Sequence, residues 1–429
     1  MTQVNINVHY VTRIEGHGNL VLNARDGKIE KLLWEVPESP RLFEAMLIGR
    51  HYDDVHHIAS RICGICSIAH TTASIQATEA AFGVKLSEQT ILLRKLLYHA
   101  EMLESHVLHT VMLAAPDFLG AESVIPLASS HPDVVILALR LKKLAYNLAE
   151  AIAQRKTHPL SCVVGGFAKF PDPAELKALR KRLVDAYADL DIVVGLFKTL
   201  KVPDFVRDTE YIALQDPNEY AFINGKIASS DTAAVPLTDY RKVTNEFVVP
   251  QSTAKYTKHK RDAYMVSALS RFNLNSKQLS PKAKKAAKDL GLVAPNHNPY
   301  MITVAQLVEL FHVVEDSVNI IDQLLAKGIK DEPVNVKPKA GTGVGAVEAP
   351  RGILFHEYTY DANGIITKAN CIIPTNQNHN NIQKDLEALV PKILNKTEAE
   401  ITLMMEMLVR AYDPCVSCST HALQVEIKK

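Results

Sequence analysis

Alternating apolar and polar positions predict β-structure near both ends of the chain. Residues 4–36 alternate in this way, and Asp26-Gly27 interrupts the pattern. A period of two with an Asp-Gly pair is typical of antiparallel strands joined by a tight turn. Residues 352–373 show the same arrangement, with Asn363-Gly364 as the turn. We therefore predict a small antiparallel sheet in each of these two segments.

Between these segments the apolar spacing changes to that of amphipathic helices. Apolar residues recur at i, i+3, i+4 and i+7, which places them on one face of a helix. The segments with this spacing are 88–115, 133–154, 173–200, 304–325 and 380–411. The pattern therefore predicts a mainly helical α+β fold, in which small antiparallel sheets near the N-terminus and around 352–373 flank a central bundle of long helices.

The length of 429 residues would by itself allow about three domain-sized units. However, no internal repeat and no low-complexity linker divides the sequence. We therefore predict a single domain over 1–429. Within it, 1–38 would form the N-terminal sheet and 39–330 the helical body, and 331–429 would hold the hairpin, the last helix and a C-terminal cysteine motif.

Charge and composition argue against two classes of protein, those that bind nucleic acid and those that span a membrane. The chain has 48 Lys and Arg against 47 Asp and Glu, which leaves no basic field to hold nucleic acid. The N-terminus is polar without an apolar signal segment, and no run of apolar residues approaches the ~20 that a membrane helix needs. We therefore expect a cytoplasmic protein with no membrane span, whose thiols stay reduced.

Four of the six cysteines form two C-x-x-C pairs, Cys63 with Cys66 and Cys415 with Cys418. Four thiolates suit zinc, nickel, copper(I) or an iron–sulfur cluster. A zinc ribbon would keep its pairs about 15–20 residues apart, whereas almost the whole chain separates these two. A thioredoxin-like pair would need a βαβ context that neither pair has. Spacing favours one metal shared by both pairs, while separate redox pairs or structural zinc stay open.

The residues around these pairs carry a resemblance to a known family. Six blocks occur in order: 11–17 (VTRIEGH), 40–50 (PRLFEAMLIGR), 61–70 (RICGICSIAH), 348–352 (EAPRG), 371–378 (CIIPTNQN) and 413–421 (DPCVSCSTH). Together they resemble the large, catalytic subunit of [NiFe] hydrogenases, and the resemblance runs the length of the chain. It implies an enzyme that oxidises H2 and reduces protons reversibly.

The resemblance implies a nickel–iron centre held by all four cysteines. Cys63 and Cys415 would be terminal nickel ligands, and Cys66 and Cys418 would bridge to an iron that carries two cyanides and one carbon monoxide. Thiolates suit this role because they donate electrons strongly to nickel. A cysteine of the set can also take the first proton, so Cys418 is counted among the catalytic residues.

Other residues receive roles by motif position. Glu15 would transfer protons; by sequence alone a solvated strand carboxylate is the favoured interpretation, and the family motif reverses that preference. Arg351 would lie over the open metal position, with Asp117 and Asp413 around it. Pro350, Arg351 and Thr375 would hold the cyanides, and His70 would hydrogen-bond the Cys66 sulfur. A third ion, magnesium or iron, would bind Glu44, His421 and the backbone carbonyl of Cys371.

The family resemblance also implies partners, because this chain has no cysteine spacing for an iron–sulfur cluster and no flavin fold. Electrons would leave through a small subunit with iron–sulfur clusters, and then through iron–sulfur and flavin subunits to NAD(P), as in the cytoplasmic sulfhydrogenase-type branch. A maturation protease and nickel chaperones would act on the chain, and residues 422–429 could be the segment removed. A deazaflavin- or heterodisulfide-linked hydrogenase subunit is the alternative, as is a metal-free or zinc-binding structural subunit.

Overall fold

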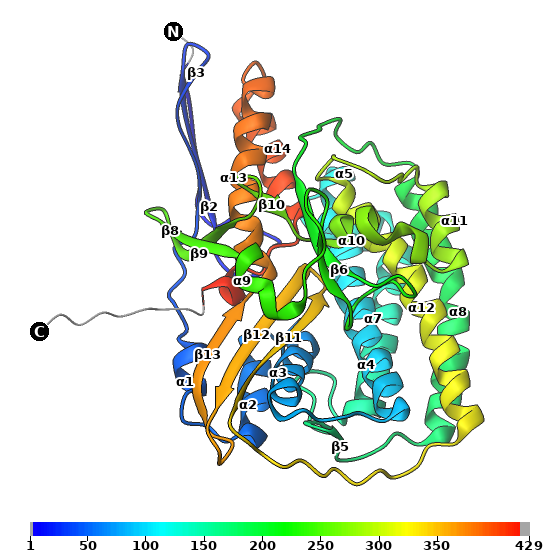
Figure 1. Cartoon of the computed structure of the whole chain (residues 1–429). Helices are drawn as coiled ribbons and strands as arrows, with labels where there is room; N and C mark the ends of the chain where they lie inside the picture. Colours follow the sequence, from blue (N-terminus) through cyan, green and yellow to red (C-terminus); the bar gives the residue numbers. More distant parts are fainter. Residues whose placement is uncertain (1–2, 421–429) are drawn as a thin grey trace, which may run out of the picture.

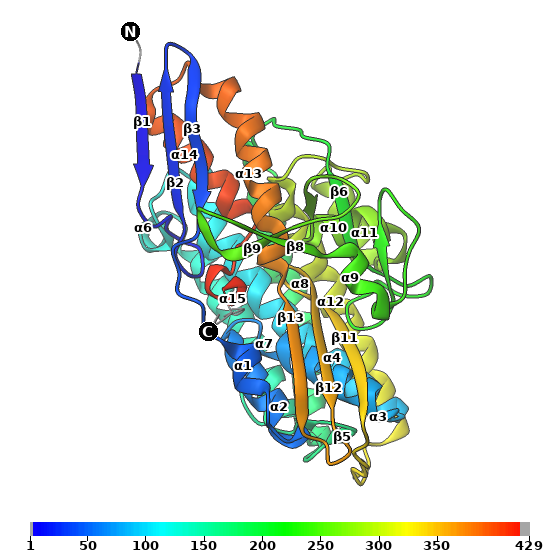
Figure 2. The same ribbon diagram turned by 60° about the vertical axis from the view of Figure 1, so that its left-hand side comes forward.

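The computed structural model describes residues 3–420 of the chain. The predicted N-terminal sheet is present, with antiparallel strands β1 (Gln3–Val8), β2 (Asn19–Arg25) and β3 (Lys28–Glu35) in that order. Asp26 and Gly27 both adopt left-handed backbone angles, with φ of 49° and 77°, as a tight turn between twisted strands requires. Figure 2 shows this sheet standing beside the last long helices of the chain.

Four long helices form the body of the molecule (Figure 1). They are α4 (Glu88–Val107), α7 (Pro132–Ala153), α8 (Pro173–Phe197) and α12 (Met301–Lys327), which confirms the predicted bundle. A π-helical segment, Leu108–Ala114, extends α4. The shorter helices are α1 (Phe43–Leu47), α2 (Tyr52–Ala59), α3 (Ser67–Phe82), α5 (Ala115–Phe118), α6 (Val124–Ser130), α9 (Tyr240–Val243), α10 (Ala268–Asn275) and α11 (Pro281–Asp289).

Short strands fill the middle of the chain. They are β4 (Cys162–Val163), β5 (Gly166–Phe167), β6 (Glu210–Gln215), β7 (Lys226–Ser229), β8 (Asn245–Val249), β9 (Ser252–Lys258) and β10 (Tyr264–Met265). All pair antiparallel except β10, which lies parallel to β6.

The second predicted sheet has three strands rather than the two expected. β12 (Gly352–Tyr360) and β13 (Ile366–Ile372) form the predicted hairpin, and β11 (Gly341–Ala349) pairs antiparallel with β12. Glycines, which disfavour strands, hid β11 from the sequence pattern. They are needed because α3 packs directly on this strand, and a Cβ on Gly343 would lie 2.1 Å from the Ala77 carbonyl oxygen.

The predicted last helix over 380–411 is two helices. α13 (Pro374–Ile393) ends before Thr397, which begins α14 (Glu398–Ala411), and a short α15 (Val416–Ser419) follows. Thr397 accepts from the Glu400 amide at 3.3 Å while Glu400 accepts from the Thr397 amide at 3.0 Å. This reciprocal cap starts a new helix at Thr397, so the prediction of one continuous helix was wrong.

Buried apolar side chains connect distant parts of the chain. One large cluster includes Val4 of the N-terminal sheet, Leu307 of the bundle and Cys418 of the terminal motif. A smaller cluster lies between β6, β7 and the β11–β13 sheet. The large cluster thus places both cysteine pairs in the interior.

None of the helices in the described range combines the length and the apolar character needed to cross a membrane.

Candidate metal centre

The two cysteine pairs meet inside the molecule. The four sulfur atoms of Cys63, Cys66, Cys415 and Cys418 lie within 4.8 Å of one another, and all four residues are buried. The sulfurs of Cys63 and Cys415, which come from different pairs, are 3.5 Å apart. Cysteines from opposite ends of the chain therefore converge on one site.

Local structure explains how each pair is presented. The first pair follows a helical turn, Ser60–Ile62, and Cys66 is the residue from which α3 starts. The second pair follows the end of α14, where Asp413 turns the chain with φ of 50°. A parallel bridge then joins the backbone of Glu15 to that of Cys415, through Glu15 N–H to the Pro414 oxygen at 3.2 Å and Val416 N–H to the Glu15 oxygen at 2.8 Å.

The sulfurs of the terminal pair, Cys415 and Cys418, are joined as a disulfide in the structure, whereas Cys63 and Cys66 are free thiols. Metals bind the thiolate form of cysteine. The form of the protein that holds a metal with all four sulfurs is therefore the one in which Cys415 and Cys418 are reduced.

In the pair Cys63 and Cys66, the surrounding groups favour the thiolate form of Cys63. A hydrogen bond with Cys66 lowers the pKa of the Cys63 thiol, and the Arg351 guanidinium lowers it further. The same hydrogen bond, together with burial, raises the pKa of the Cys66 thiol. The first proton of this pair therefore leaves Cys63 more readily than Cys66, and the nearby positive charge helps to hold a negatively charged sulfur.

Glu15 lies directly against the terminal cysteine motif. Its Oε2 atom is 3.1 Å from the Cys415 sulfur, a hydrogen-bonding distance, and accepts from the Ser417 backbone N–H at 3.2 Å. The Ser417 hydroxyl donates to Oε1. The structure thus brings this predicted residue to the Cys415 sulfur, where a carboxylate can receive a proton from the thiol once Cys415 is reduced.

Arg351 is buried beside the sulfurs and bound to Asp413. Its Nη2 donates to Asp413 Oδ1 at 2.8 Å and its Nε to the Asp413 backbone oxygen. Its Nη1 is buried without a hydrogen-bond partner in the described part of the chain. A buried guanidinium N–H without an acceptor is costly, so this donor is suited to an acceptor bound between Arg351 and the cysteines.

Thr375 and Pro350 also lie in this neighbourhood. The Thr375 hydroxyl accepts from the Cys415 backbone N–H at 2.9 Å, and Thr375 is 1% exposed. Pro350 immediately precedes Arg351 in the turn between β11 and β12, since Ala349 pairs with Gly352. Both residues therefore border the region that the cysteines and Arg351 enclose.

Asp117 and His70 make hydrogen bonds that the family resemblance did not imply. Asp117 binds Arg410 through two contacts of 2.7 and 2.9 Å and Arg13 at 2.5 Å, and it makes no hydrogen bond to Arg351 within the described range. The His70 Nδ1 atom is 3.1 Å from the Nε2 of His356. The roles assigned to both residues remain predictions.

The residues expected to hold a third ion are only partly described. Glu44 accepts from the Cys371 backbone N–H at 2.7 Å, so two of the three predicted contributors are adjacent. His421 lies outside the described residues. The remaining cysteine, Cys162, is buried, and burial raises the pKa of its thiol to about 11, as expected for an inert core residue.

Sequence reasoning missed three polar residues around the centre. Ser417 binds Glu15, Arg410 binds Asp117, and Arg271 on α10 binds the backbone at Ala349 and Pro350. Ser417 lies within the cysteine motif and could have been noticed. Arg271 lies outside every motif block, so no local sequence signal identifies it.

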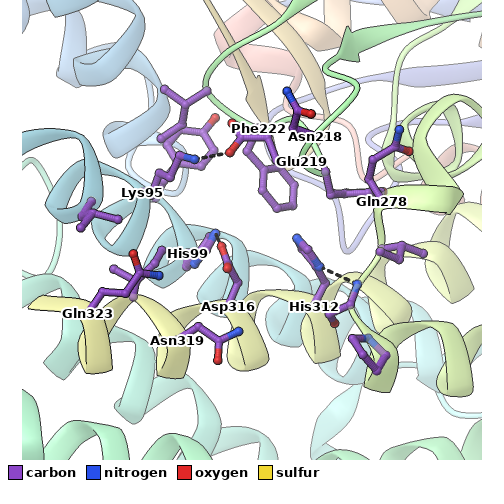
Figure 3. A pocket seen from close by; sticks show the side chains of 18 residues that line it. Lys95, His99, Asn218, Glu219, Phe222, Gln278, His312, Asp316, Asn319 and Gln323 are labelled. Atoms are coloured by element: carbon purple, nitrogen blue, oxygen red, sulfur yellow. Dashed lines mark hydrogen bonds and ion pairs between the residues drawn. The ribbon is translucent and has the colours of Figure 1, made fainter. Parts of the chain in front are cut away.

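Two cavities lie near the bundle but differ in their relation to the cysteines. One of about 210 Å³ is lined by Gly64 and Ile65 of the first cysteine motif and by Glu101 of α4. A larger one of about 490 Å³ lies between α4, α12 and neighbouring segments, and Figure 3 shows His99, His312 and Asp316 around it. No cysteine lines the larger cavity within the part of the chain that the structure describes.

The donor set fits a soft metal. Four buried sulfurs converge, a guanidinium whose Nη1 has no partner among the described residues lies beside them, and a carboxylate contacts one sulfur. Thiolate ligands of this kind suit nickel, zinc and iron. The geometry alone therefore identifies a four-sulfur metal centre without choosing the metal.

Comparisons with known proteins favour nickel among these metals. The family described as nickel-dependent hydrogenase matches residues 41–133 and 257–421. The alpha chain of sulfhydrogenase 1 from Pyrococcus furiosus is 32% identical over 98% of both chains. A vhc subunit of the F420-non-reducing hydrogenase from Methanococcus voltae is 30% identical over 99% of this chain and 96% of its own.

Solved hydrogenase structures have the same fold as this chain. A chain of an NAD+-reducing [NiFe]-hydrogenase in the H2-reduced state superposes with a TM-score of 0.87 and 26% identity, over 97% of this chain and 99% of its own. A chain of the Ni-Fe-Se hydrogenase from D. vulgaris Hildenborough shares the fold, with a TM-score of 0.77 and 22% identity, over 98% of this chain and all of its own.

Proposed function

The chain belongs to the nickel-dependent hydrogenase family and is the catalytic large subunit of a hydrogenase, and on that premise we propose how its residues act and which electron acceptor it serves. The observation that carries the proposal is the convergence of four buried sulfurs within 4.8 Å. We propose that Cys63, Cys66, Cys415 and Cys418 hold nickel together with an iron that carries two cyanides and carbon monoxide.

The bound centre would supply the Lewis-acid and redox chemistry that oxidises H2 to two protons and two electrons. Glu15 receives a proton released at the centre. Its Oε2 lies 3.1 Å from the Cys415 sulfur, within the range for direct transfer. The Ser417 hydroxyl and backbone N–H hold the carboxylate at that sulfur.

Arg351 would orient acceptor groups at the open side of the centre. Its Nη1 donor is free among the described residues, and Asp413 fixes the rest of the guanidinium. A fixed cation in a water-poor site stabilises negative charge as it develops. We propose that this donor and the Thr375 hydroxyl hold the cyanides, with Pro350 shaping the same pocket, and that Asp117 supports the surrounding arginines.

Glu44, the Cys371 carbonyl and His421 are proposed to bind a magnesium or iron ion. Carboxylate and carbonyl oxygens suit magnesium, and imidazole suits iron. What supports the assignment is the 2.7 Å contact between Glu44 and the Cys371 backbone.

We propose NAD(P) as the final electron acceptor, in a cytoplasmic complex. The TM-score of 0.87 with a chain of an NAD+-reducing enzyme supports this choice. A small subunit with iron–sulfur clusters, together with flavin-containing subunits, would carry electrons from the cysteine centre to NAD(P). A protease and nickel chaperones would mature the chain. The F420-non-reducing relatives favour a deazaflavin- or heterodisulfide-linked complex as the second candidate.

Elemental analysis of the purified complex tests the proposal. We expect about one nickel per copy of this chain, infrared bands of metal-bound cyanide and carbon monoxide, and H2-driven reduction of NAD+ or NADP+. Zinc without nickel would overturn the assignment of the centre. Nickel with H2 oxidation but no nicotinamide reduction would overturn only the proposed acceptor.

A further inference from the structure

Arg271 is a buried arginine that belongs to none of the motif blocks. It lies on α10, is 0% exposed, and makes five hydrogen bonds. Nε and Nη2 donate to the two carboxylate oxygens of Glu309, both at 2.7 Å, and Nη1 donates to Glu348 Oε2 at 3.1 Å. The other two bonds go to the backbone oxygens of Ala349 and Pro350, both at 3.0 Å. An arginine has five N–H donors, so each one is used.

The two backbone oxygens belong to the consecutive peptide groups that lead into Arg351. Ala349 pairs with Gly352 at the end of the β11–β12 hairpin, so Pro350 and Arg351 form its two-residue turn. Arg271 therefore holds both peptide planes before the Arg351 Cα atom. This fixes the direction in which the Arg351 side chain leaves the backbone.

The charge of Arg271 is secured mainly by Glu309, because burial raises the pKa of the Glu348 carboxyl to about 7. Burial alone would lower the pKa of Arg271, but Glu309 and Glu348 raise it above its ordinary value. Burial opposes ionisation of Glu309, yet Arg271 and His106 hold the pKa of that carboxyl at about 2. Glu309 lies on α12, so the turn is tied to the longest helix of the bundle by an ion pair that stays charged near neutral pH.

The consequence concerns Nη1 of Arg351, the guanidinium nitrogen that has no hydrogen-bond partner among the described residues. Asp413 holds Arg351 Nε and Nη2 from the terminal cysteine motif, and Arg271 holds its backbone from the bundle. These contacts at both ends of the residue restrict the orientation of Nη1. We propose that Arg271 is a positioning residue that keeps this donor of Arg351 aimed into the cysteine centre; the inference rests on the proposed function.

Arg271→Lys tests the proposal because lysine keeps the charge and loses the planar fork. Arg94→Lys is the matched control. Arg94 is 3% exposed and binds the Glu79 carboxylate at 2.8 and 2.6 Å and the Val163 backbone oxygen at 3.0 Å. Both variants lose a buried bidentate pair, but only Arg271 contacts the turn that carries Arg351.

Both variants are compared with the unmodified protein in the complete hydrogenase complex. We expect both to lower Tm. Only Arg271→Lys should lower kcat for H2-driven reduction, by about tenfold or more, because a small displacement of a catalytic group is costly. Only Arg271→Lys should also change the electron paramagnetic resonance spectrum of the oxidised nickel. Unchanged kcat and an unchanged spectrum in Arg271→Lys, with Tm lowered as in Arg94→Lys, would overturn the proposal.

A second pair of variants decides the question if Arg271→Lys does not fold. Glu309→Gln weakens the anchor of Arg271, and Glu79→Gln weakens that of Arg94 in the same way. The proposal requires a lower kcat and an altered nickel spectrum in Glu309→Gln only, and equal values in both variants would overturn it. Absence of nickel from the unmodified complex would instead overturn the proposed function, so the two failures are distinguishable.

Discussion

Glu15 is the carboxylate that touches a ligand sulfur, and its contacts define what its replacement should do. Glu15→Gln keeps the size of the side chain and an oxygen that can accept from Ser417, but an amide cannot carry the proton from Cys415. We expect the nickel content to stay unchanged and H2-driven reduction to fall by about 10²-fold or more. The measurements are metal analysis and H2-driven dye reduction on the same sample.

Glu38→Gln is the matched control for Glu15. Glu38 accepts from the His17 backbone N–H at 2.9 Å, two residues from Glu15 in sequence, and makes no hydrogen bond to any of the four cysteines within the described residues. It should retain full activity. If Glu15→Gln is as active as this control, the assignment of Glu15 as the proton acceptor is refuted.

Glu101 has a structural task at the start of the helix that carries Cys66. Its carboxylate accepts from the backbone N–H groups of Ile68 and Ala69 at 2.6 and 3.1 Å, and no side chain at the N-cap of α3 itself closes that end. Glu101→Ala would leave these buried donors unpaired, at a cost of about 2–3 kcal/mol. We expect a lower Tm and less bound nickel per chain.

Glu88→Ala is the control for Glu101→Ala, because Glu88 lies on the same helix, α4, and is exposed. Substitutions at exposed positions change stability by no more than about 0.5 kcal/mol. Equal Tm and nickel content in the two alanine variants would refute the capping role of Glu101.

Motifs could predict which residues lie near the cysteine cluster, but not all of their partners. The cysteines, Glu15 and Arg351 lie close together, because each lies in a motif block whose position the fold fixes. Asp117 pairs with Arg410 and Arg13, and His70 Nδ1 faces His356. Such partners come from elements far away in sequence, so their identity depends on the packing of those elements.

At the scale of elements, the contact between α3 and β11 is unusually close. Gly343 has no room for a side chain, because a Cβ would lie 2.1 Å from the Ala77 oxygen and 2.4 Å from the Ala81 nitrogen. Gly343→Ala must push α3 away from the sheet. We expect Tm to fall by about 2–3 °C, the shift that about 2–3 kcal/mol produces in a protein of this size, and bound nickel to decrease because Cys66 is the N-cap residue of α3.

Gly195→Ala in α8 is the comparison for this element. A Cβ at Gly195 meets no described atom within 4 Å, so alanine should be neutral or raise stability by about 0.5–1 kcal/mol. If Tm and bound nickel are the same in Gly343→Ala and Gly195→Ala, the close packing of α3 on β11 is not needed for the position of Cys66.

Periodicity predicted the long helices well because their apolar faces are regular over many turns. It failed at β11, where glycines replace the alternating apolar residues, and at Thr397, where a local cap interrupts an otherwise helical spacing. Both failures come from short-range features that a window of apolar spacing averages out.

At the scale of the whole molecule, buried histidines determine how the protein responds to acid. Burial lowers the pKa of His56, His99 and His379 to about 3 and that of His312 to about 4. Below the ordinary value of 6.5 the unfolded chain binds protons that the folded chain does not, so stability falls with falling pH. Each histidine contributes up to about 1.4 kcal/mol per pH unit between 6.5 and its folded pKa.

We therefore expect Tm to be lower at pH 5.5 than at pH 7.5, measured by thermal unfolding under anaerobic conditions. His56→Leu should reduce this pH dependence, since both ring nitrogens of His56 are buried without partners among the described residues and leucine loses no hydrogen bond. A pH dependence that is unchanged in this variant would contradict the linkage.

The bridge between Glu15 and Cys415 joins opposite ends of the chain, so the parts of the site are synthesised at different times. The ribosome makes the first cysteine pair, the bundle and the strands of every described sheet before it reaches Cys415 and Cys418. The nascent chain therefore has Cys63 and Cys66 long before their partners exist, and these two thiols must stay reduced without a complete ligand set. All four sulfurs can surround a metal only after translation has passed the terminal motif.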